Sequence, residues 1–223
     1  MRKCSPIPAL KPRLTRGRLV YLTVWLALAV PLVVILWTGL TGGIRGRDAM
    51  VVHLGMGAVR ILILGFALSP AARLLRLPVL HRYKRTVGLF GFAYAAAHGV
   101  YYFFYGRVWE FTLRIWERRL YIPLGMLALV LLIPLAVTST DGMVRAMGPR
   151  AWRRLHASFY VTLAIAGVHG LWQNNIDYLQ PSIYLALIAA LLLVRVPPVM
   201  QGLMTLGAGR RRVRKAQVSA SAP

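Results

Sequence analysis

The sequence predicts an all-α integral membrane protein, a bundle of six transmembrane helices with both termini in the cytoplasm. Three observations predict it: an apolar composition, six apolar segments each about one bilayer thick, and an uneven distribution of basic residues among the loops. Hydrophobic residues make up 58% and charged residues 15% of the 223 residues, against roughly 45–50% and 25% in soluble domains. This composition excludes an ordinary soluble domain and a disordered chain.

The six apolar segments justify the helix count in order. The first, 19–40, contains Pro31 and is not followed by a small-residue cleavage pattern, so we expect a retained helix rather than a signal peptide. The other five are expected at 50–68, 87–105, 120–137, 155–172 and 181–196. Runs of this length without polar–apolar alternation favour helices over membrane strands. The chain then divides into a basic tail (1–18), a transmembrane domain (19–196) and a second basic tail (197–223).

The distribution of charge predicts the orientation in the membrane. Most of the 28 Lys and Arg residues lie in the two tails, the second-to-third loop and the fourth-to-fifth loop. The other three loops hold four of the five acids (Asp48, Glu110, Glu117 and Asp177). The positive-inside rule therefore places both termini of this multi-pass protein in the cytoplasm, and the family resemblance described below implies the bacterial inner membrane as its location. Because the basic residues lie between apolar runs, their partner is the lipid bilayer and not nucleic acid.

Histidines are the side chains best suited to carry chemistry, because acids are scarce and Cys4, the single cysteine, excludes a disulfide or a cysteine metal site. His98 and His169 lie about 16 Å and 21 Å from the cytoplasmic ends of their helices. An isolated histidine in a bundle can simply hydrogen-bond a neighbour. Two histidines of different helices at similar depth can instead ligate one haem iron from both sides.

His156 indicates a second site nearer the cytoplasm, with Lys84, Arg85 or His81 as its partner by depth. His156 and His169 are 13 residues apart, which places them roughly 140° apart around an ideal helix. They would share a face only if that helix were irregular.

Arg60 lies in the middle of the second segment, seven residues after His53 and on roughly the same face. An arginine inside the membrane needs a partner. We consider two interpretations: Arg60 contacts a haem propionate or a quinone oxygen, or it snorkels or pairs with a backbone carbonyl.

Several short motifs, in order along residues 53–195, resemble the MsrQ (YedZ) family of the ferric-reductase-like transmembrane group. They are LSPAAR at 68–73, RTVGL at 85–89, VTST at 137–140, WRRLH at 152–156 followed by Tyr160, HGLW at 169–172, and Gln180-Pro181 with Tyr184. In the larger ferric-reductase group a histidine stands 14 residues before the position of His98, where this chain has Lys84.

The resemblance implies a b-type cytochrome with one or two haems ligated by His98, His156 and His169, and FMN as a further cofactor. It implies electrons taken from the quinone pool or from a cytosolic flavin reductase. Their acceptor would be MsrP, a periplasmic molybdopterin enzyme that reduces methionine sulfoxide in oxidised proteins. The chain would then be an electron-transfer subunit rather than the catalytic subunit. The alternatives are a transmembrane ferric or oxygen reductase and a haem-free membrane scaffold or transporter.

Overall fold

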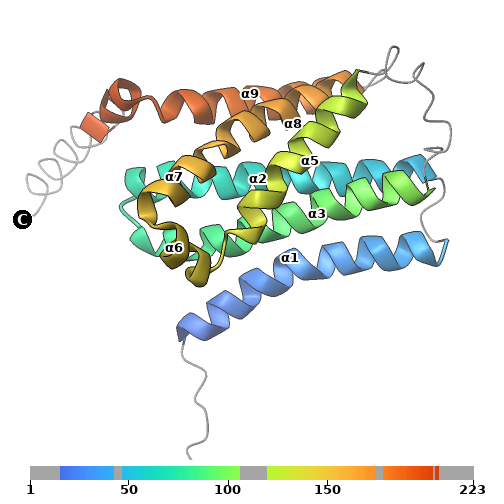
Figure 1. The fold of residues 1–223 in the computed structure, drawn as a ribbon, viewed down its shortest axis with the longest axis horizontal. Helices are drawn as coiled ribbons and strands as arrows, with labels where there is room; N and C mark the ends of the chain where they lie inside the picture. Colours follow the sequence, from blue (N-terminus) through green and yellow to red (C-terminus); the bar gives the residue numbers. More distant parts are fainter. Residues whose placement is uncertain (1–15, 43–46, 106–119, 174–177, 203, 206–223) are drawn as a thin grey trace, which may run out of the picture.

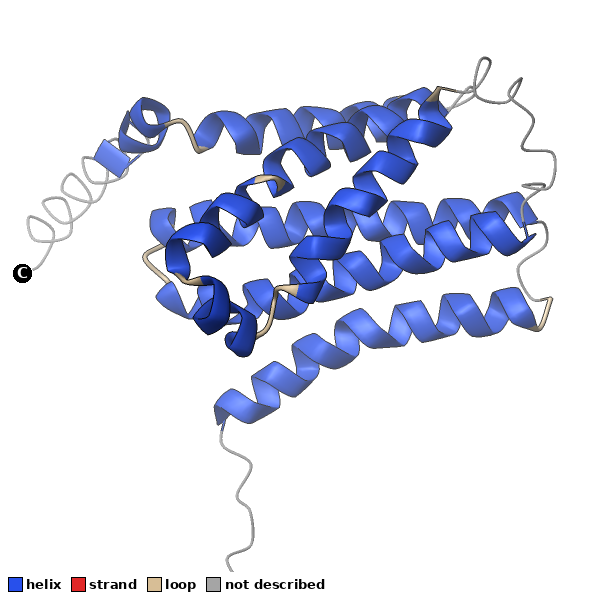
Figure 2. Ribbon diagram, in the orientation of Figure 1, coloured by secondary structure: helices blue, strands red, loops and turns tan. Residues whose placement is uncertain are grey.

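The structure, a computed structural model, describes residues 16–42, 47–105, 120–173, 178–202 and 204–205. Every regular element within these ranges is a helix, as Figure 2 shows, so the predicted all-α class is confirmed. Most of the two basic tails, and the predictions for Cys4, Glu110, Glu117 and Asp177, lie outside the described residues.

Each of the six predicted apolar segments is helical in the described residues, the fifth with an irregular turn at Ser158 between α7 and α8. The long helices are α1 (Arg16–Leu40), α2 (Arg47–Leu74), α3 (Lys84–Tyr105), α5 (Tyr121–Val137), α8 (Phe159–Gln173) and α9 (Leu179–Val194). Shorter elements connect them: the 3-10 helix η1 (Pro78–Tyr83) precedes α3, and α6 (Asp141–Met147) and α7 (Pro149–Ala157) join α5 to α8. Figure 1 shows α6 and α7 at the end of the bundle where α2 ends and α3 begins.

The helix lengths identify the candidate membrane spans. In the described residues four stretches are long and apolar enough to cross a membrane: Gly17–Leu40, Ala49–Leu74, Pro78–Phe104 and Pro149–Gln173. A fifth results if α5 and α6, which are bent by 90° relative to each other, count as one span. The 16-residue helix α9 is apolar but shorter. The protein is therefore built as a multi-pass helical bundle.

The second helix extends beyond the predicted apolar segment 50–68, because α2 continues through Pro70 to Leu74. A proline inside a helix removes one N–H, so the carbonyl four residues earlier, here that of Phe66, lacks its helical partner. Arg195 Nη2, from the end of α9, donates to the Phe66 carbonyl at 2.8 Å. A long-range hydrogen bond therefore compensates the proline and lets the helix continue.

The predicted segment 155–172 lies within the continuous candidate span Pro149–Gln173, which has an irregular turn at Ser158. Ser158 separates α7 from α8, and both its backbone N–H and its hydroxyl donate to the Leu155 carbonyl, at 3.0 and 2.7 Å. A serine hydroxyl that bonds the preceding turn competes with the regular helical pattern. This irregular turn lies between His156 and His169, so the angle of an ideal helix does not apply to this pair.

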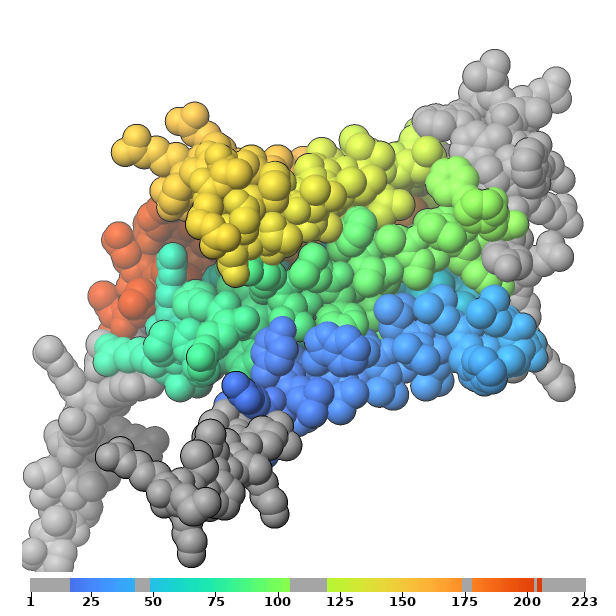
Figure 3. Space-filling model, turned by 60° about the horizontal axis from the view of Figure 1, so that its bottom comes forward, coloured from blue at the N-terminus to red at the C-terminus, as the bar shows by residue number. Residues whose placement is uncertain are grey.

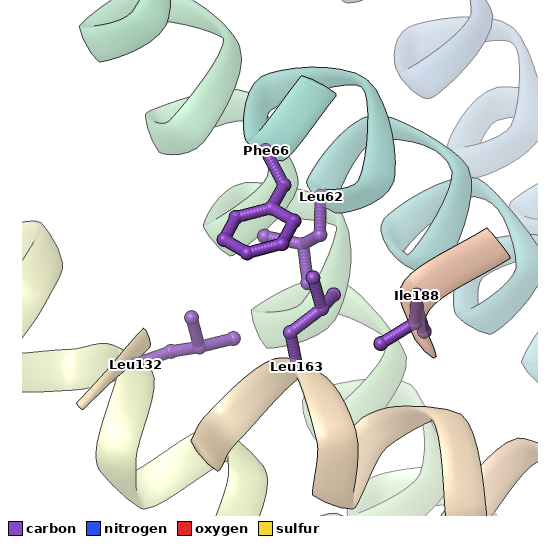
Figure 4. Close-up of a cluster of buried hydrophobic side chains, with 5 residues drawn as sticks. All are labelled: Leu62, Phe66, Leu132, Leu163 and Ile188. Carbon is purple, nitrogen blue, oxygen red and sulfur yellow. The ribbon is translucent and has the colours of Figure 1, made fainter. Parts of the chain in front are cut away.

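The core lies between α2, α5, α8 and α9. Figure 4 shows Leu62 and Phe66 of α2 against Leu132, Leu163 and Ile188 of the other three helices. Helix α1 lies along the edge of the bundle against α2 and α3, as Figures 1 and 3 show. Close packing in this core fixes the relative positions of the helices that carry the functional side chains.

Candidate functional site

The structure brings together the two histidines that the sequence paired by depth. The imidazole of His98 on α3 and that of His169 on α8 have ring centroids 6.2 Å apart, and their planes meet at 79°. Both side chains are partly buried inside the bundle. Two imidazole rings from different helices therefore lie next to each other inside the bundle.

Backbone carbonyls fix the orientation of both rings. His98 Nδ1 bonds the Val51 carbonyl at 2.9 Å, and His169 Nδ1 bonds the Tyr121 carbonyl at 2.6 Å. A carbonyl only accepts, so each Nδ1 carries the hydrogen and each Nε2 keeps its lone pair. This arrangement is typical of metal-ligating histidines, whose second nitrogen donates to a backbone carbonyl or a carboxylate.

Two glycines of neighbouring helices make room for the rings, and the sequence analysis missed them. A Cβ on Gly55 of α2 would lie 3.0 Å from His98 Nδ1. A Cβ on Gly125 of α5 would lie 2.6 Å from His169 Cε1. Glycine is unfavourable inside a helix, so these interior glycines were the available signal for a close approach by another residue.

The residues present fit a haem iron. Two imidazoles on opposite sides of one metal, each with Nε2 about 2 Å from it, place their ring centroids about 6 Å apart. The observed separation is 6.2 Å. Haem iron takes imidazole as an axial ligand, and the porphyrin supplies the remaining ligands. The described part of the chain has no group of three or more His, Cys, Asp or Glu side chains, so a metal held only by protein ligands is not indicated there.

A second feature is a cavity of about 830 Å³, lined by residues of α7, of the last turns of α2 and of the first turns of α3. This volume lies within the range of small-molecule pockets, about 300–1,000 Å³. Its lining includes apolar and aromatic side chains, among them Phe66 and Phe92, but no acid. Seven basic side chains also line it: Arg73, His81, Lys84, Arg85, Arg153, His156 and Arg195.

His156 lines this cavity together with all three partners proposed from the sequence, Lys84, Arg85 and His81. His156 Nε2 lies 3.1 Å from Thr138 Oγ1, and this hydroxyl donates to the Pro134 carbonyl at 2.6 Å. The hydroxyl hydrogen is thus used, so His156 Nε2 donates to Thr138 and Nδ1 is the acceptor. The histidine is therefore held in the opposite tautomer from His98 and His169.

An uncompensated positive charge distinguishes this cavity. Arg195 lies 3.9 Å over the Phe66 ring and donates from Nη1 to Tyr160 Oη at 3.0 Å. Its Nε is the only buried side-chain N or O atom without a hydrogen-bond partner among the described residues. The positive charges of Arg195 and Arg73 are close enough to Lys84 to repel its ammonium group. Arg195 is half-buried while Lys84 and Arg73 are exposed, and such a group of cations without an acid favours the binding of an anionic group.

Arg85 differs from the other cations of the cavity because it has an acidic partner. Its Nη2 lies 2.7 Å from Asp141 Oδ1, in an exposed ion pair between α3 and the start of α6. The hydrogen bond and the charge of Arg85 lower the pKa of the Asp141 carboxyl.

The remaining two predicted site residues lie apart from both features. His53 is exposed, and its Nδ1 bonds the Ala49 carbonyl of its own helix at 2.6 Å. Arg60 donates from Nε to Tyr184 Oη of α9 at 2.6 Å. Arg60 thus contacts a tyrosine of another helix, which neither interpretation from the sequence included.

Comparison with known proteins agrees with this architecture. Residues 54–167 match the family described as ferric reductase like transmembrane component. A relative from Caulobacter vibrioides is 42% identical over 194 residues, which cover 83% of this chain and 90% of the relative. A relative from Rhodospirillum rubrum is 34% identical over 83% of this chain and 91% of its own length, and one from Brucella anthropi is 35% identical over 78% and 81%.

All three relatives carry the name protein-methionine-sulfoxide reductase heme-binding subunit MsrQ. The matched region contains the helices that hold His98, His156 and the glycines facing the histidine pair. The alignments with the relatives extend over most of this chain and most of theirs. The chain therefore belongs to the MsrQ family of ferric-reductase-like transmembrane proteins.

Proposed function

We propose that the protein is a b-type cytochrome subunit that carries electrons through the inner membrane to the periplasmic molybdopterin enzyme MsrP, and so supports the repair of oxidised proteins. The observation that carries this proposal is the His98–His169 pair, 6.2 Å apart between ring centroids. The names of the relatives, heme-binding subunits of a protein-methionine-sulfoxide reductase, support it.

The chain's own residues perform three tasks in this function. His98 and His169 would supply Nε2 to the iron, while the carbonyls of Val51 and Tyr121 hold the two rings in place. Gly55 and Gly125 leave space for the rings. When bound, a haem of this type stores and releases one electron at its iron. The packed helices exclude water, which favours electron transfer over reaction with oxygen.

A six-span topology with both termini in the cytoplasm completes the proposal. Six apolar segments are helical, and an even number of spans agrees with the basic residues at both ends of the chain. The 90° bend between α5 and α6 lets α6 and α7 lie across the cytoplasmic end of the bundle. In this orientation the basic cavity faces the cytoplasm, and the histidine pair lies nearer the periplasm.

The basic cavity is proposed as the FMN site. Arg195, Lys84 and Arg73 would bind the phosphate, and other aromatic side chains of the lining, such as Phe92 and Trp152, would cover the ring system. A flavin bound there would receive electrons from a cytosolic flavin reductase, while the quinone pool is the second proposed donor.

A second haem is the other candidate occupant of the cavity. The observation that supports it is that His156, His81 and Lys84, which could serve as axial ligands, line the same cavity. His156 Nε2 would first have to leave Thr138. This rearrangement makes FMN the preferred occupant.

Cofactor analysis of the detergent-purified protein tests the proposal. Haem and flavin are measured per chain in the parent and in His98→Ala, His169→Ala and His156→Ala. We expect a b-type spectrum that His98→Ala and His169→Ala abolish and His156→Ala leaves unchanged. Two haems in the parent, one of which His156→Ala removes, would instead assign the cavity to haem.

Two outcomes would favour the alternative functions. A folded parent without haem, purified from haem-replete cells, would contradict the proposal and favour a scaffold or transporter. Electron delivery to ferric citrate or oxygen that is faster than delivery to MsrP would favour a ferric or oxygen reductase.

A further inference from the structure

A polar cluster lies where α2 packs against α9, outside the histidine pair and the basic cavity. Arg60 Nε donates to Tyr184 Oη at 2.6 Å, and Gln180 Nε2 donates to the same oxygen at 3.1 Å. Arg60 is exposed, while Gln180 and Tyr184 are half-buried. Both helices are otherwise apolar here, so the cluster reaches an apolar surface of the bundle through the exposed Arg60.

The cluster lies within the membrane-spanning part of the bundle. Arg60 is eleven residues from the start of the span Ala49–Leu74, about 16 Å along the helix axis. On α9, Tyr184 is five residues from Leu179, about 7.5 Å from the start of that helix. A guanidinium in this position is costly unless it binds a partner.

Hydrogen-bonding capacity remains unused in this cluster. Among the described residues, Arg60 Nη1 and Nη2 make no hydrogen bond, and no acid pairs with them. Tyr184 Oη accepts two hydrogen bonds, so its own hydrogen can be donated outward. Gln180 Oε1 can accept. The cluster therefore offers donors and an acceptor side by side toward the lipid.

The cluster is also close to the histidine pair. Gly55, which faces the His98 ring, precedes Arg60 by five residues on α2, about 7.5 Å along the axis. A molecule hydrogen-bonded to Arg60 would therefore lie, along the axis of α2, one to two helical turns from the level of the histidine pair.

We propose that Arg60, Tyr184 and Gln180 bind the head group of an isoprenoid quinol within the membrane. A quinone oxygen accepts from Arg60 and Tyr184, and a quinol hydroxyl can donate to Gln180 Oε1. This head group is uncharged, diffuses in the hydrocarbon region and carries the matching set of donors and acceptors. The proposal rests on the proposed function, because the quinol would be the electron donor to the haem.

The redox balance of this step is simple. Oxidation of one quinol to the quinone releases two electrons and two protons. A haem held by His98 and His169 would accept these two electrons one at a time, in two successive steps, and the two protons would leave to water.

Stopped-flow reduction of the haem-loaded protein by decylubiquinol in lipid nanodiscs tests the inference. The variants are Arg60→Gln and Tyr184→Phe, with Ser182→Ala, an exposed position on the same part of α9, as the matched control. We expect Arg60→Gln to slow reduction at low quinol concentration by about tenfold or more, the loss expected when a charge-assisted hydrogen bond is removed. Saturating decylubiquinol should restore most of the rate, and Ser182→Ala should match the parent.

Dithionite reduction separates this inference from the proposed function. Full haem content and full dithionite reduction in Arg60→Gln, together with slow decylubiquinol reduction, support the quinol site. An unchanged decylubiquinol rate in Arg60→Gln and Tyr184→Phe overturns it while leaving the haem assignment intact. A loss of haem from Arg60→Gln also overturns it and assigns the arginine to a haem propionate.

A lipid head group is the remaining occupant that the test distinguishes. If phosphatidylglycerol in the nanodisc raises the Tm of the parent but not of Arg60→Gln, and the decylubiquinol rates are equal, the cluster is a phospholipid site and the quinol proposal fails.

Discussion

Gly125→Ala tests whether the His169 ring position matters for haem binding. The added Cβ would lie 2.6 Å from His169 Cε1, 2.8 Å from Nδ1 and 3.1 Å from Nε2. Because a packed ring must move to relieve such contacts, the hydrogen bond to the Tyr121 carbonyl is strained as well. Overpacking of this kind costs about 1–3 kcal/mol. If this cost falls on the haem-bound state, haem affinity drops about 5-fold to 150-fold.

Haem titration of the apoprotein, followed at the Soret band, measures this effect. Gly170→Ala is the matched control, because it neighbours His169 on α8 and its Cβ would have no atom within 4 Å. Gly55→Ala, whose Cβ would lie 3.0 Å from His98 Nδ1, should weaken binding less than Gly125→Ala. Haem affinity in Gly125→Ala equal to that of the parent would refute the reasoning.

Two further predictions concern stability. Arg195→Met removes the donor to the Phe66 carbonyl, which Pro70 leaves without a helical partner. We therefore expect a free energy of unfolding lower by about 1–3 kcal/mol, measured by thermal unfolding in detergent with the exposed Arg145→Met as the control. An equal Tm in both variants would show that α2 does not depend on this bond. Asp141→Asn removes the exposed pair with Arg85. Because Arg85 lowers the pKa of Asp141 in the folded state, the pair stabilises above the ordinary aspartate pKa and this contribution is lost as pH falls through the lowered pKa. The small Tm difference between parent and Asp141→Asn should therefore be present at pH 7 and shrink toward about pH 3; a difference that grows on acidification would contradict the assignment.

Hydrophobic runs and histidine depth were sufficient to predict the helices and the His98–His169 pairing. The helices and the histidine pairing can both be read from local sequence. Bilayer thickness sets the length of a span, and the rise per residue sets the depth of a histidine within it. The continuation of α2 through Pro70 could not be predicted in this way. It depends on Arg195, which is more than a hundred residues away and appeared in the sequence only as a topology signal.

The surroundings of the histidines were equally inaccessible from the sequence. Gly55 and Gly125 lie against histidine rings of other helices, and this contact can be recognised only once the packing of the helices is known. Thr138 was noted only as part of a motif, and the structure shows it bonded to His156 through its hydroxyl and to Trp152 Nε1 through its carbonyl at 2.9 Å. The tautomer of a histidine depends on such partners, which no spacing rule contains.

The electron paramagnetic resonance spectrum of the oxidised, haem-loaded protein tests the central claim most directly. Two imidazole ligands whose planes meet at 79° predict a low-spin ferric signal of the strongly anisotropic type that near-perpendicular axial ligands give. His98→Ala and His169→Ala should each remove this signal, because either variant leaves the iron with one histidine. A high-spin signal in the parent, or a low-spin signal that persists in either variant, would contradict ligation of one haem by these two histidines.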